Sequence, residues 1–184
     1  MKFTDVFIKG LKIIEPAIYN DGRGAFFESY NQEKFVNAGI ADNFIQDNQS
    51  LSQKGVLRGL HFQTGKYSQA KLVRVIKGSV IDVAVDLRAN SETYGKHFSI
   101  ELNETNNLMF YIPVGFAHGF IALDDQTVFV YKCTSLYNKE AEGGIIWNDT
   151  SLRINWGGLN PIISQKDALL PTFDNAKHFF LNTF

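Results

Sequence analysis

The chain is poor in cysteine and carries almost no net charge. Cys133 is the single cysteine among 184 residues, so no disulfide can form within the chain, and the composition fits a reducing compartment. The formal net charge is −1 at pH 7. Without a basic field, nothing in the composition favours a nucleic acid or a membrane surface as a partner.

Long apolar runs and sequence repeats are lacking as well. Lys2, Asp5 and Lys9 interrupt any signal-peptide core near the N-terminus, and no later run is long enough to cross a bilayer. No block of like charges, low-complexity tract or repeat marks a linker or a solenoid. We therefore expect a cytoplasmic protein with one domain over residues 1–184.

Apolar and β-forming residues are plentiful. Hydrophobic residues make up 45% of the chain, and 16 of them are Phe, which excludes global disorder. Short segments rich in Val, Ile, Phe and Tyr alternate with Gly, Asn and Asp, as expected for strands separated by turns. These segments cover residues 11–19, 24–30, 71–87, 97–102, 108–113, 118–123, 127–137 and 152–156.

One pair of these strands is predicted to form a hairpin. Between residues 73 and 85 the apolar side chains fall roughly at every second position, and Lys77-Gly78 is typical of a tight turn. Helical patterns are few and cover residues 31–39 and 164–170. A mainly β chain with short helices predicts a sandwich or a barrel.

Two motifs resemble the metal-binding signatures of the small β-barrels called cupins. In the first, Gly55 is followed after five residues by His61, and Gly78 closes the motif. In the second, PVGFAH over residues 113–118 supplies the pattern P-x-G-x-x-H. The positions where cupins have a second His, a Glu and an Asn hold Gln63, Lys71 and Ala122.

These replacements argue against a divalent metal. A catalytic metal usually has about three protein ligands, and only His61 and His118 remain here, with the cation of Lys71 in the same motif. A fixed ammonium instead stabilises an oxyanion, such as an enolate, as it develops. A neutral His beside it can remove a carbon-bound proton, because the ordinary pKa of histidine lies near working pH. The residues therefore predict proton abstraction next to a carbonyl, with no metal and no other cofactor.

Five motifs in one order resemble the dTDP-4-dehydrorhamnose 3,5-epimerase family. They are RGLHFQ, QAKLVRVIKGSVIDVAVDLR, IPVGFAHGF, YKCT and WNDTSLRINW, and the resemblance runs from about Gly10 to about Leu170. It implies a cupin, or jelly-roll, β-barrel with a few short peripheral helices. It also implies a homodimer that acts on a nucleotide-linked 4-keto-6-deoxy sugar. TGKYSQ departs from the family pattern, because it lacks the proline usual in that loop.

The resemblance also implies roles for individual residues. His61 corresponds to the base, Asp167 to the carboxylate that orients it, and Tyr131 to the acid that returns a proton from the opposite face. Lys71 corresponds to the cation near the sugar oxygens. Arginine suits a diphosphate because its planar fork binds two oxygens at once. The positions that contact nucleotide, diphosphate or sugar in the family are Arg23, Glu28, Gln46, Asn48, Arg58, His118, Glu142 and Lys166.

The local sequence leaves two of these assignments open. Ser164-x-x-Asp167 resembles a capping box, so Asp167 could cap a helix instead of orienting His61. Strict alternation places Arg58 on the opposite face from His61, unless Gly59 marks a bulge or Arg58 contacts the substrate from the strand end.

Alternation also predicts where several side chains point. Lys71 has the parity of Val73 and is expected to face inward rather than to protect a sheet edge. Tyr131 and Cys133 share one face, so Cys133 is expected to be a core residue and not a nucleophile. His118 is expected at a turn near the barrel mouth.

The predicted function is the epimerisation of dTDP-4-dehydro-6-deoxyglucose to dTDP-4-dehydrorhamnose at carbons 3 and 5, in dTDP-rhamnose biosynthesis. Two alternatives in the same class are an epimerase of carbon 3 only and a ketoisomerase that moves the carbonyl from carbon 4 to carbon 3. From a different class, a non-catalytic sugar-nucleotide-binding cupin would bind the ligand without proton exchange. A metal-dependent oxygenase or isomerase is the least favoured alternative.

Overall fold

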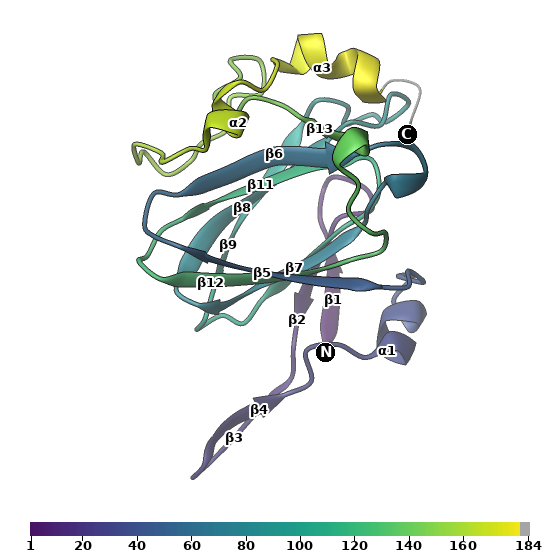
Figure 1. Ribbon diagram of the computed structural model, residues 1–184. Helices are drawn as coiled ribbons and strands as arrows, with labels where there is room; N and C mark the ends of the chain where they lie inside the picture. Colours follow the sequence, from purple (N-terminus) through teal and green to yellow (C-terminus); the bar gives the residue numbers. More distant parts are fainter. Residues whose placement is uncertain (181–184) are drawn as a thin grey trace.

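Two antiparallel β-sheets face each other in the computed structural model, which describes residues 1–180 (Figure 1). The first sheet contains, in spatial order, β1 (Lys2–Asp5), β2 (Lys12–Glu15), β10 (Met109–Ile112), β7 (Lys71–Lys77), β12 (Thr127–Cys133) and β5 (Gln46–Ser52). The second contains β13 (Glu142–Gly144), β6 (Leu57–Gln63), β11 (Phe116–Ala122), β8 (Ser79–Asp86) and β9 (His97–Asn103). Residues 181–184, which the single-domain prediction includes, lie outside the described residues.

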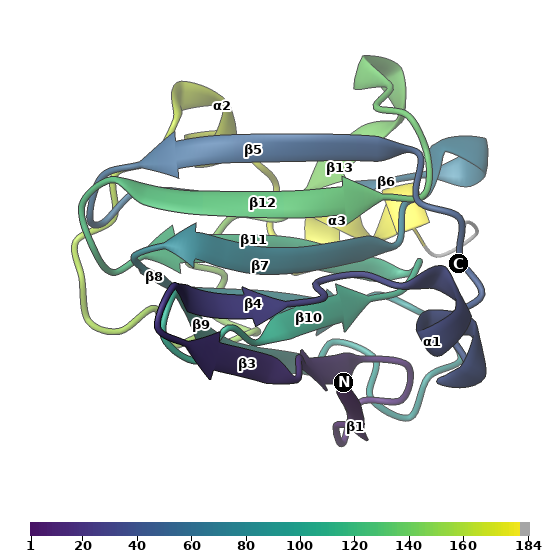
Figure 2. The same ribbon diagram turned by 90° about the horizontal axis from the view of Figure 1, so that it is seen from below.

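The prediction of a mainly β barrel with short peripheral helices is confirmed. Seen from below, the long strands β5, β12 and β7 run side by side across the first sheet (Figure 2). The helices are α1 (Gln32–Asn37), α2 (Gln165–Ala168) and α3 (Phe173–Phe180). The first two lie within the predicted helical segments and begin after side-chain caps from Asn31 and Ser164. None of the helices in residues 1–180 is long and apolar enough to span a membrane.

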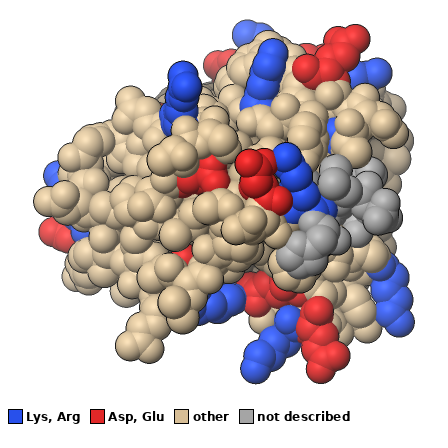
Figure 3. All heavy atoms as spheres, turned by 90° about the horizontal axis from the view of Figure 1, so that it is seen from above, with Lys and Arg blue, Asp and Glu red and all other residues tan. Residues whose placement is uncertain are grey.

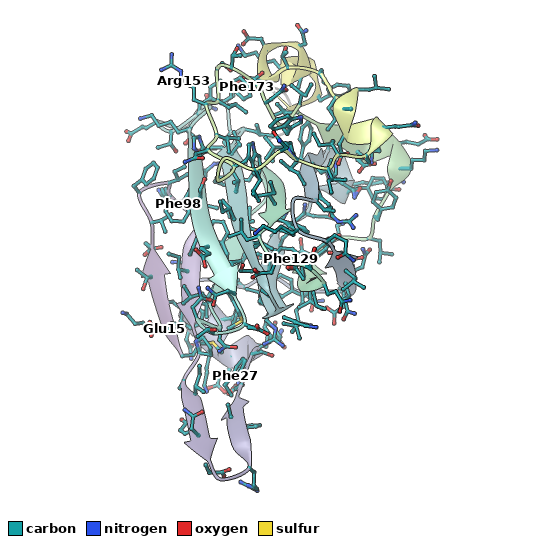
Figure 4. The ribbon with its side chains drawn as sticks, turned by 90° about the vertical axis from the view of Figure 1, so that its left-hand side faces the viewer. Glu15, Phe27, Phe98, Phe129, Arg153 and Phe173 are labelled. Atoms are coloured by element: carbon teal, nitrogen blue, oxygen red, sulfur yellow. The ribbon has the colours of Figure 1, made fainter. Side chains whose placement is uncertain are left out.

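The barrel interior is filled by alternate residues of both sheets. Val73 and Val75 of β7 point inward, as does Phe129 of β12, and all three are buried. Phe129 lies in the middle of the barrel (Figure 4), and its ring centroid is 4.1 Å from that of Phe120 in the opposite sheet. Burying a side chain of this kind stabilises the fold by about 1.5–3 kcal/mol. The packed interior therefore holds the two sheets in a fixed relation around the site.

A second apolar layer covers the outer face of the second sheet. There Leu152, Trp156 and Phe173 belong to one buried cluster with Val83 and Val85 of β8. β8 is therefore buried on both of its faces, which explains why apolar residues follow one another so closely in its sequence.

Two strand predictions are wrong. Residues 152–156 form a turn and irregular backbone, so their apolar pattern reflects burial in the second layer and not a strand ladder. β7 and β8 do not form the predicted hairpin, because β7 pairs with β10 and β12 while β8 pairs with β9 and β11. Gly78, with a φ of 78°, carries the chain from one sheet to the other, and a Cβ there would lie 2.5 Å from Thr127 Oγ1. Alternation identifies which face of a strand is buried, but not which strand pairs with it in the sheet.

A short ribbon projects from the barrel. The predicted strand at 11–19 divides into β2 and β3 (Ile18–Asp21), and β3 pairs with β4 (Gly24–Phe27) in a separate sheet. We call β3 and β4, residues 18–27, the arm. It points away from the barrel, with Phe27 near its base (Figures 1 and 4). Tyr19 and Phe26 of the arm are 67% and 72% exposed, an unusual position for large rings.

Candidate active site

A cavity of about 600 Å³ lies between the two sheets. Its polar lining comes from both sheets and from α2, and includes Asn48, Arg58, His61, Lys71, His118, Tyr131, Lys166 and Asp167. A neighbouring hollow of about 390 Å³ is also lined by His61, Lys71 and Tyr131, and extends the site to Gln46 and Glu142. The structure therefore brings together all the predicted site residues except Arg23 and Glu28.

His61 and Asp167 form a hydrogen-bonded pair at this cavity. His61 Nε2 lies 2.7 Å from Asp167 Oδ1, although 106 residues separate them in the sequence. The His61 side chain is 27% exposed and that of Asp167 only 6%. Burial raises the pKa of the Asp167 carboxyl, but the hydrogen bond and charge of His61, with the Gly59 amide, lower that pKa overall. The pair therefore consists of an accessible imidazole oriented by a buried carboxylate.

Asp167 also takes part in the N-terminal cap of α2, and the two roles use different atoms. The backbone N–H of Asp167 donates to Ser164 Oγ at 3.0 Å, which caps the helix. The carboxylate remains available to His61 and accepts a longer hydrogen bond from Gly59 N at 3.4 Å. The helix cap and the contact with His61 coexist, which resolves the alternative left open by the sequence.

A bulge in β6 turns Arg58 and His61 toward the same cavity. The pairing register between β6 and β11 shifts at this point. Gly59 has a φ of 128°, and a Cβ on it would lie 2.5 Å from Gly119 Cα. Only glycine fits such a backbone and such a close approach. The bulge predicted as one explanation for Arg58 is confirmed.

Lys71 and Tyr131 reach the cavity from the first sheet. They occupy the inward faces of β7 and β12, as alternation predicts, and Cys133 beside them is a core residue with 1% exposure. Burial lowers the pKa of the Lys71 ammonium, although nearby groups, Asp82 and Glu142 among them, oppose this shift. Burial raises the pKa of the Tyr131 hydroxyl. The cavity thus holds a poorly solvated lysine amine beside a phenol whose pKa is raised.

His118 belongs to a second His–Asp pair, and its predicted location at a turn is wrong. It lies within β11, which begins at Phe116, and its side chain is 7% exposed. Its Nε2 lies 2.9 and 3.1 Å from the two carboxylate oxygens of Asp82, a fully buried residue of β8. Burial lowers the pKa of His118, and the charges of Lys71 and His61 add to this effect, while Asp82 opposes it.

The sequence prediction omits Asp82, and the available signal is an acid between apolar residues in the interior of a strand. Within β8, Asp82 is flanked by Ile81 and Val83. A carboxylate in such a position is almost never fully buried without a partner. The partner, however, lies 36 residues further along the chain and was not identifiable from local sequence.

A third group of side chains lies at the edge of the neighbouring hollow. Lys166 Nζ is 2.6 Å from Glu142 Oε1, and the Tyr137 hydroxyl donates to Glu142 Oε2 at 2.9 Å. Burial raises the pKa of Glu142, but its hydrogen bonds with these two residues lower that pKa overall. Tyr137 is 53% exposed and is missing from the predicted set. We call Tyr137, Glu142 and Lys166 the mouth cluster.

Arg23 and Glu28 lie elsewhere. Arg23 is at the tip of the arm, where its side chain is 90% exposed and pairs with Asp21 at 2.6 Å. Glu28 follows β4 and pairs with Lys34 of α1 at 2.8 Å. Because the arm points away from the barrel (Figure 1), Arg23 does not line the cavity of its own chain.

The positive charge of the site is confined to the cavity and is not part of a larger basic surface on the face seen in Figure 3. On the face seen from above in Figure 3, Lys and Arg are intermixed with Asp and Glu rather than gathered by sign. Inside the cavity, Arg58, Lys71 and Lys166 supply cations. Among the side chains that the structure describes, no group of three or more His, Cys, Asp or Glu is placed to hold a metal ion. The arrangement suits an anionic ligand and the stabilisation of an oxyanion.

Comparison with known proteins finds relatives along nearly the whole chain. A family model described as dTDP-4-dehydrorhamnose 3,5-epimerase matches residues 5–175. A protein of that name from Methanothermobacter thermautotrophicus is 50% identical over 169 residues, which cover 90% of this chain and 91% of the relative.

Solved structures show the same similarity in three dimensions. A dTDP-6-deoxy-D-glucose-3,5-epimerase from Legionella pneumophila, in complex with dTDP-4-keto-L-rhamnose, is 44% identical, with a TM-score of 0.95 and coverage of 100% of this chain and 98% of the other. A 3'-monoepimerase from Streptomyces bikiniensis, in complex with dTDP-quinovose, is 31% identical, with a TM-score of 0.88 and coverage of 94% and 88%. The fold is therefore common to enzymes that differ in the number of carbons they invert.

Proposed function

Because the chain belongs to the dTDP-4-dehydrorhamnose 3,5-epimerase family of isomerases, we propose that it converts dTDP-4-dehydro-6-deoxyglucose to dTDP-4-dehydrorhamnose. The observation that carries this proposal is the position of two proton-transfer groups. His61 stands on β6 of the second sheet and Tyr131 on β12 of the first, so they enter the cavity from opposite walls. Inversion needs this arrangement, because the proton must leave one face of the carbon and return to the other.

His61 acts as the base in the first step. The 4-keto group acidifies the hydrogens on carbons 3 and 5, because the resulting charge spreads onto the keto oxygen. The electron pair of the broken C–H bond becomes the double bond of an enolate, and the proton goes to His61. Asp167, at 2.7 Å, stabilises the imidazolium that forms.

Lys71 stabilises the enolate oxygen. Its ammonium lies in a region poor in water, where the attraction between opposite charges is stronger than in bulk solvent. His118 stays neutral because burial lowers its pKa, so it can form a hydrogen bond with the sugar without adding charge. Together the two residues lower the energy of the enolate relative to that of the ketone.

Tyr131 acts as the acid in the second step. Burial raises the pKa of its hydroxyl, so the proton is present when the enolate forms. Transfer of this proton to the carbon restores the C–H bond and the carbonyl, with inverted configuration. His61 then loses its proton to solvent and Tyr131 regains one, and the cycle repeats at the second carbon. The steps balance without an oxidant, a reductant or a metal.

The remaining cavity residues hold the rest of the substrate. Arg58 supplies a planar fork and Lys166 a point charge for the diphosphate. Gln46, Asn48 and Glu142 add hydrogen-bonding groups in the neighbouring hollow. These contacts fix the sugar so that its reacting carbons lie between His61 and Tyr131.

A homodimer would bring Arg23 and Glu28 to the substrate. The arm exposes Tyr19 and Phe26, and a second copy of the chain would cover these rings. Arg23 of the first copy would then lie at the cavity of the second copy. Light scattering of the intact protein and of a variant lacking residues 18–27 tests this arrangement. We expect a dimer for the intact protein and a monomer for the shortened one.

A cytoplasmic location fits this substrate class, because nucleotide sugars are made from nucleoside triphosphates. The single cysteine is consistent with a reducing compartment. Fractionation of cells followed by detection of the protein tests the location, and recovery outside the cytoplasm would contradict it.

NMR of dTDP-4-dehydro-6-deoxyglucose in deuterated water tests the reaction itself. We expect one deuterium at carbon 3 and one at carbon 5, with the same result after exhaustive chelation of metals. Deuterium at carbon 3 alone would identify a 3-epimerase, the second candidate and the activity for which the Streptomyces bikiniensis relative is named. Ligand binding without any exchange would identify a non-catalytic cupin.

A further inference from the structure

The segment between β12 and β13 crosses from the first sheet to the second beside the site. We call residues 134–141 the connector. It carries Tyr137 and leads directly into Glu142 of β13, so it adjoins or contains two of the three residues of the mouth cluster. The position of the connector therefore decides where these two side chains stand relative to Lys166.

Two glutamines hold the connector by consecutive backbone amides. Gln46 Oε1, from β5 of the first sheet, accepts a hydrogen bond from Tyr137 N at 2.9 Å. Gln63 Oε1, from the end of β6 in the second sheet, accepts one from Asn138 N at 2.8 Å. The connector is thus attached to both sheets at the point where it passes between them.

The contact made by Gln63 is well shielded from solvent. Gln63 is 6% exposed, so water cannot readily replace its oxygen as the acceptor for the Asn138 amide. Asn138 in turn begins the 3₁₀ turn Lys139–Ala141, because its Oδ1 accepts hydrogen bonds from two backbone amides of that turn. A shift of Asn138 would therefore move the start of β13, where Glu142 lies.

The mouth cluster lies at the more exposed end of the site. In the proposed epimerase, the reacting carbons lie among His61, Lys71 and Tyr131 inside the cavity. The exposed ring of Tyr137 and the pair of Glu142 with Lys166 lie at the edge. They are therefore available to the nucleotide diphosphate, which must extend from the sugar toward solvent.

We propose that Gln63 is a positioning residue for the nucleotide-diphosphate end of the substrate, and that it acts through the connector on Tyr137 and Glu142. Cupins have a metal-ligating histidine at this position of the strand. In this chain the same inward-facing position at the end of β6 carries the side-chain amide of Gln63. This amide holds a backbone segment, whereas the histidine of cupins holds a metal ion. This inference rests on the proposed epimerase function.

Replacement of Gln63 by Leu removes the acceptor and keeps the side-chain size. We expect Gln63→Leu to raise KM for the sugar nucleotide, and the Kd for dTDP, about tenfold, with kcat changed less than about twofold. In the free enzyme, hydrogen exchange of the Asn138 amide should become about tenfold faster, because its shielded hydrogen bond is lost. A role in stability alone would not separate KM from kcat in this way.

Two further variants control the experiment. Gln63→Glu keeps an oxygen for the Asn138 amide and should restore slow hydrogen exchange at that position. Gln53→Leu makes the same replacement at an exposed glutamine just beyond β5. It should change neither KM, nor the Kd for dTDP, nor the hydrogen exchange of the Asn138 amide. If Gln63→Leu fails to fold, Gln63→Met, with a more flexible apolar side chain, is measured in its place.

The outcomes separate this inference from the proposed function. An active Gln63 variant with unchanged KM, dTDP affinity and Asn138 exchange would overturn the role of Gln63 and leave the epimerase assignment intact. A fall in kcat at constant KM would overturn it as well. If the unaltered enzyme incorporates no deuterium at either sugar carbon, the proposed function fails, while dTDP titration and amide exchange still test Gln63.

Discussion

His61 and His118 form two similar His–Asp pairs in very different environments. The two histidines lie opposite each other in the register between β6 and β11, and each contacts an aspartate through Nε2. The His61 side chain is 27% exposed, and its aspartate, Asp167, comes from α2. The His118 side chain is 7% exposed, and its aspartate, Asp82, comes from the adjacent strand β8.

We infer that environment, and not residue type, separates the proposed base His61 from His118, whose pKa burial lowers. A proton added to His118 would create an imidazolium in a desolvated site that already contains Lys71, and burial lowers its pKa accordingly. The His61 side chain, in contrast, opens to the cavity and contacts the buried carboxylate of Asp167. The following experiments test this contrast.

The largest effect is expected for removal of the base. His61→Ala should lower kcat about 10³-fold, the magnitude of a lost general base, and should abolish deuterium incorporation above background at both sugar carbons. Steady-state kinetics and NMR in deuterated water measure the two effects. Unchanged exchange in this variant would show that His61 is not the base.

Loss of the orienting carboxylate should have the next largest effect. Asp167→Asn keeps the side-chain shape but removes the charge that stabilises the imidazolium, so kcat should fall about 10²-fold with little change in KM. The matched change in the other pair, Asp82→Asn, should lower kcat less than tenfold. Equal losses of kcat in the two variants would remove the distinction between the pairs.

The free energy of unfolding should respond in the opposite order, with a larger loss for the His118–Asp82 pair than for the His61–Asp167 pair. His118→Leu leaves the fully buried carboxylate of Asp82 without its partner and should lower the free energy of unfolding by about 2 kcal/mol. His61→Leu should cost less, because Asp167 lines the cavity and keeps the Gly59 amide as a hydrogen-bond donor. Denaturant unfolding of both variants measures the difference, and a larger loss for His61→Leu would contradict the contrast.

The smallest effect at neutral pH is expected for Lys71→Arg, which keeps the charge. Because burial lowers the pKa of Lys71, its ammonium loses the proton below the usual lysine range, and kcat/KM should fall as the pH rises through that point. Tyr131 stays protonated there, because burial raises its pKa. Lys71→Arg should move the alkaline fall to higher pH in a kcat/KM profile. If the alkaline fall of kcat/KM stays at the same pH in this variant, the fall belongs to a group other than Lys71.

Local pattern predicted the inner faces of the barrel well. Lys71, Tyr131 and Cys133 point inward as their alternation indicates, because a period of two is a property of each strand alone. The same pattern failed for the predicted hairpin of β7 and β8, whose strands belong to different sheets. It also failed for residues 152–156, where apolar side chains cover a sheet without forming a strand.

Sequence alone determined the strand-rich architecture, the family, and the replacement of cupin metal ligands by Gln63 and Lys71. Tertiary structure decided the contacts that give these residues their chemistry: Asp167 beside His61, Asp82 beside His118, and the Asn138 amide on Gln63. The physical reason is that side-chain character and alternation are local, whereas each of these contacts joins residues far apart in the chain. Such contacts depend on register, on the bulge at Gly59 and on which strand lies next to which, and no local pattern contains that information.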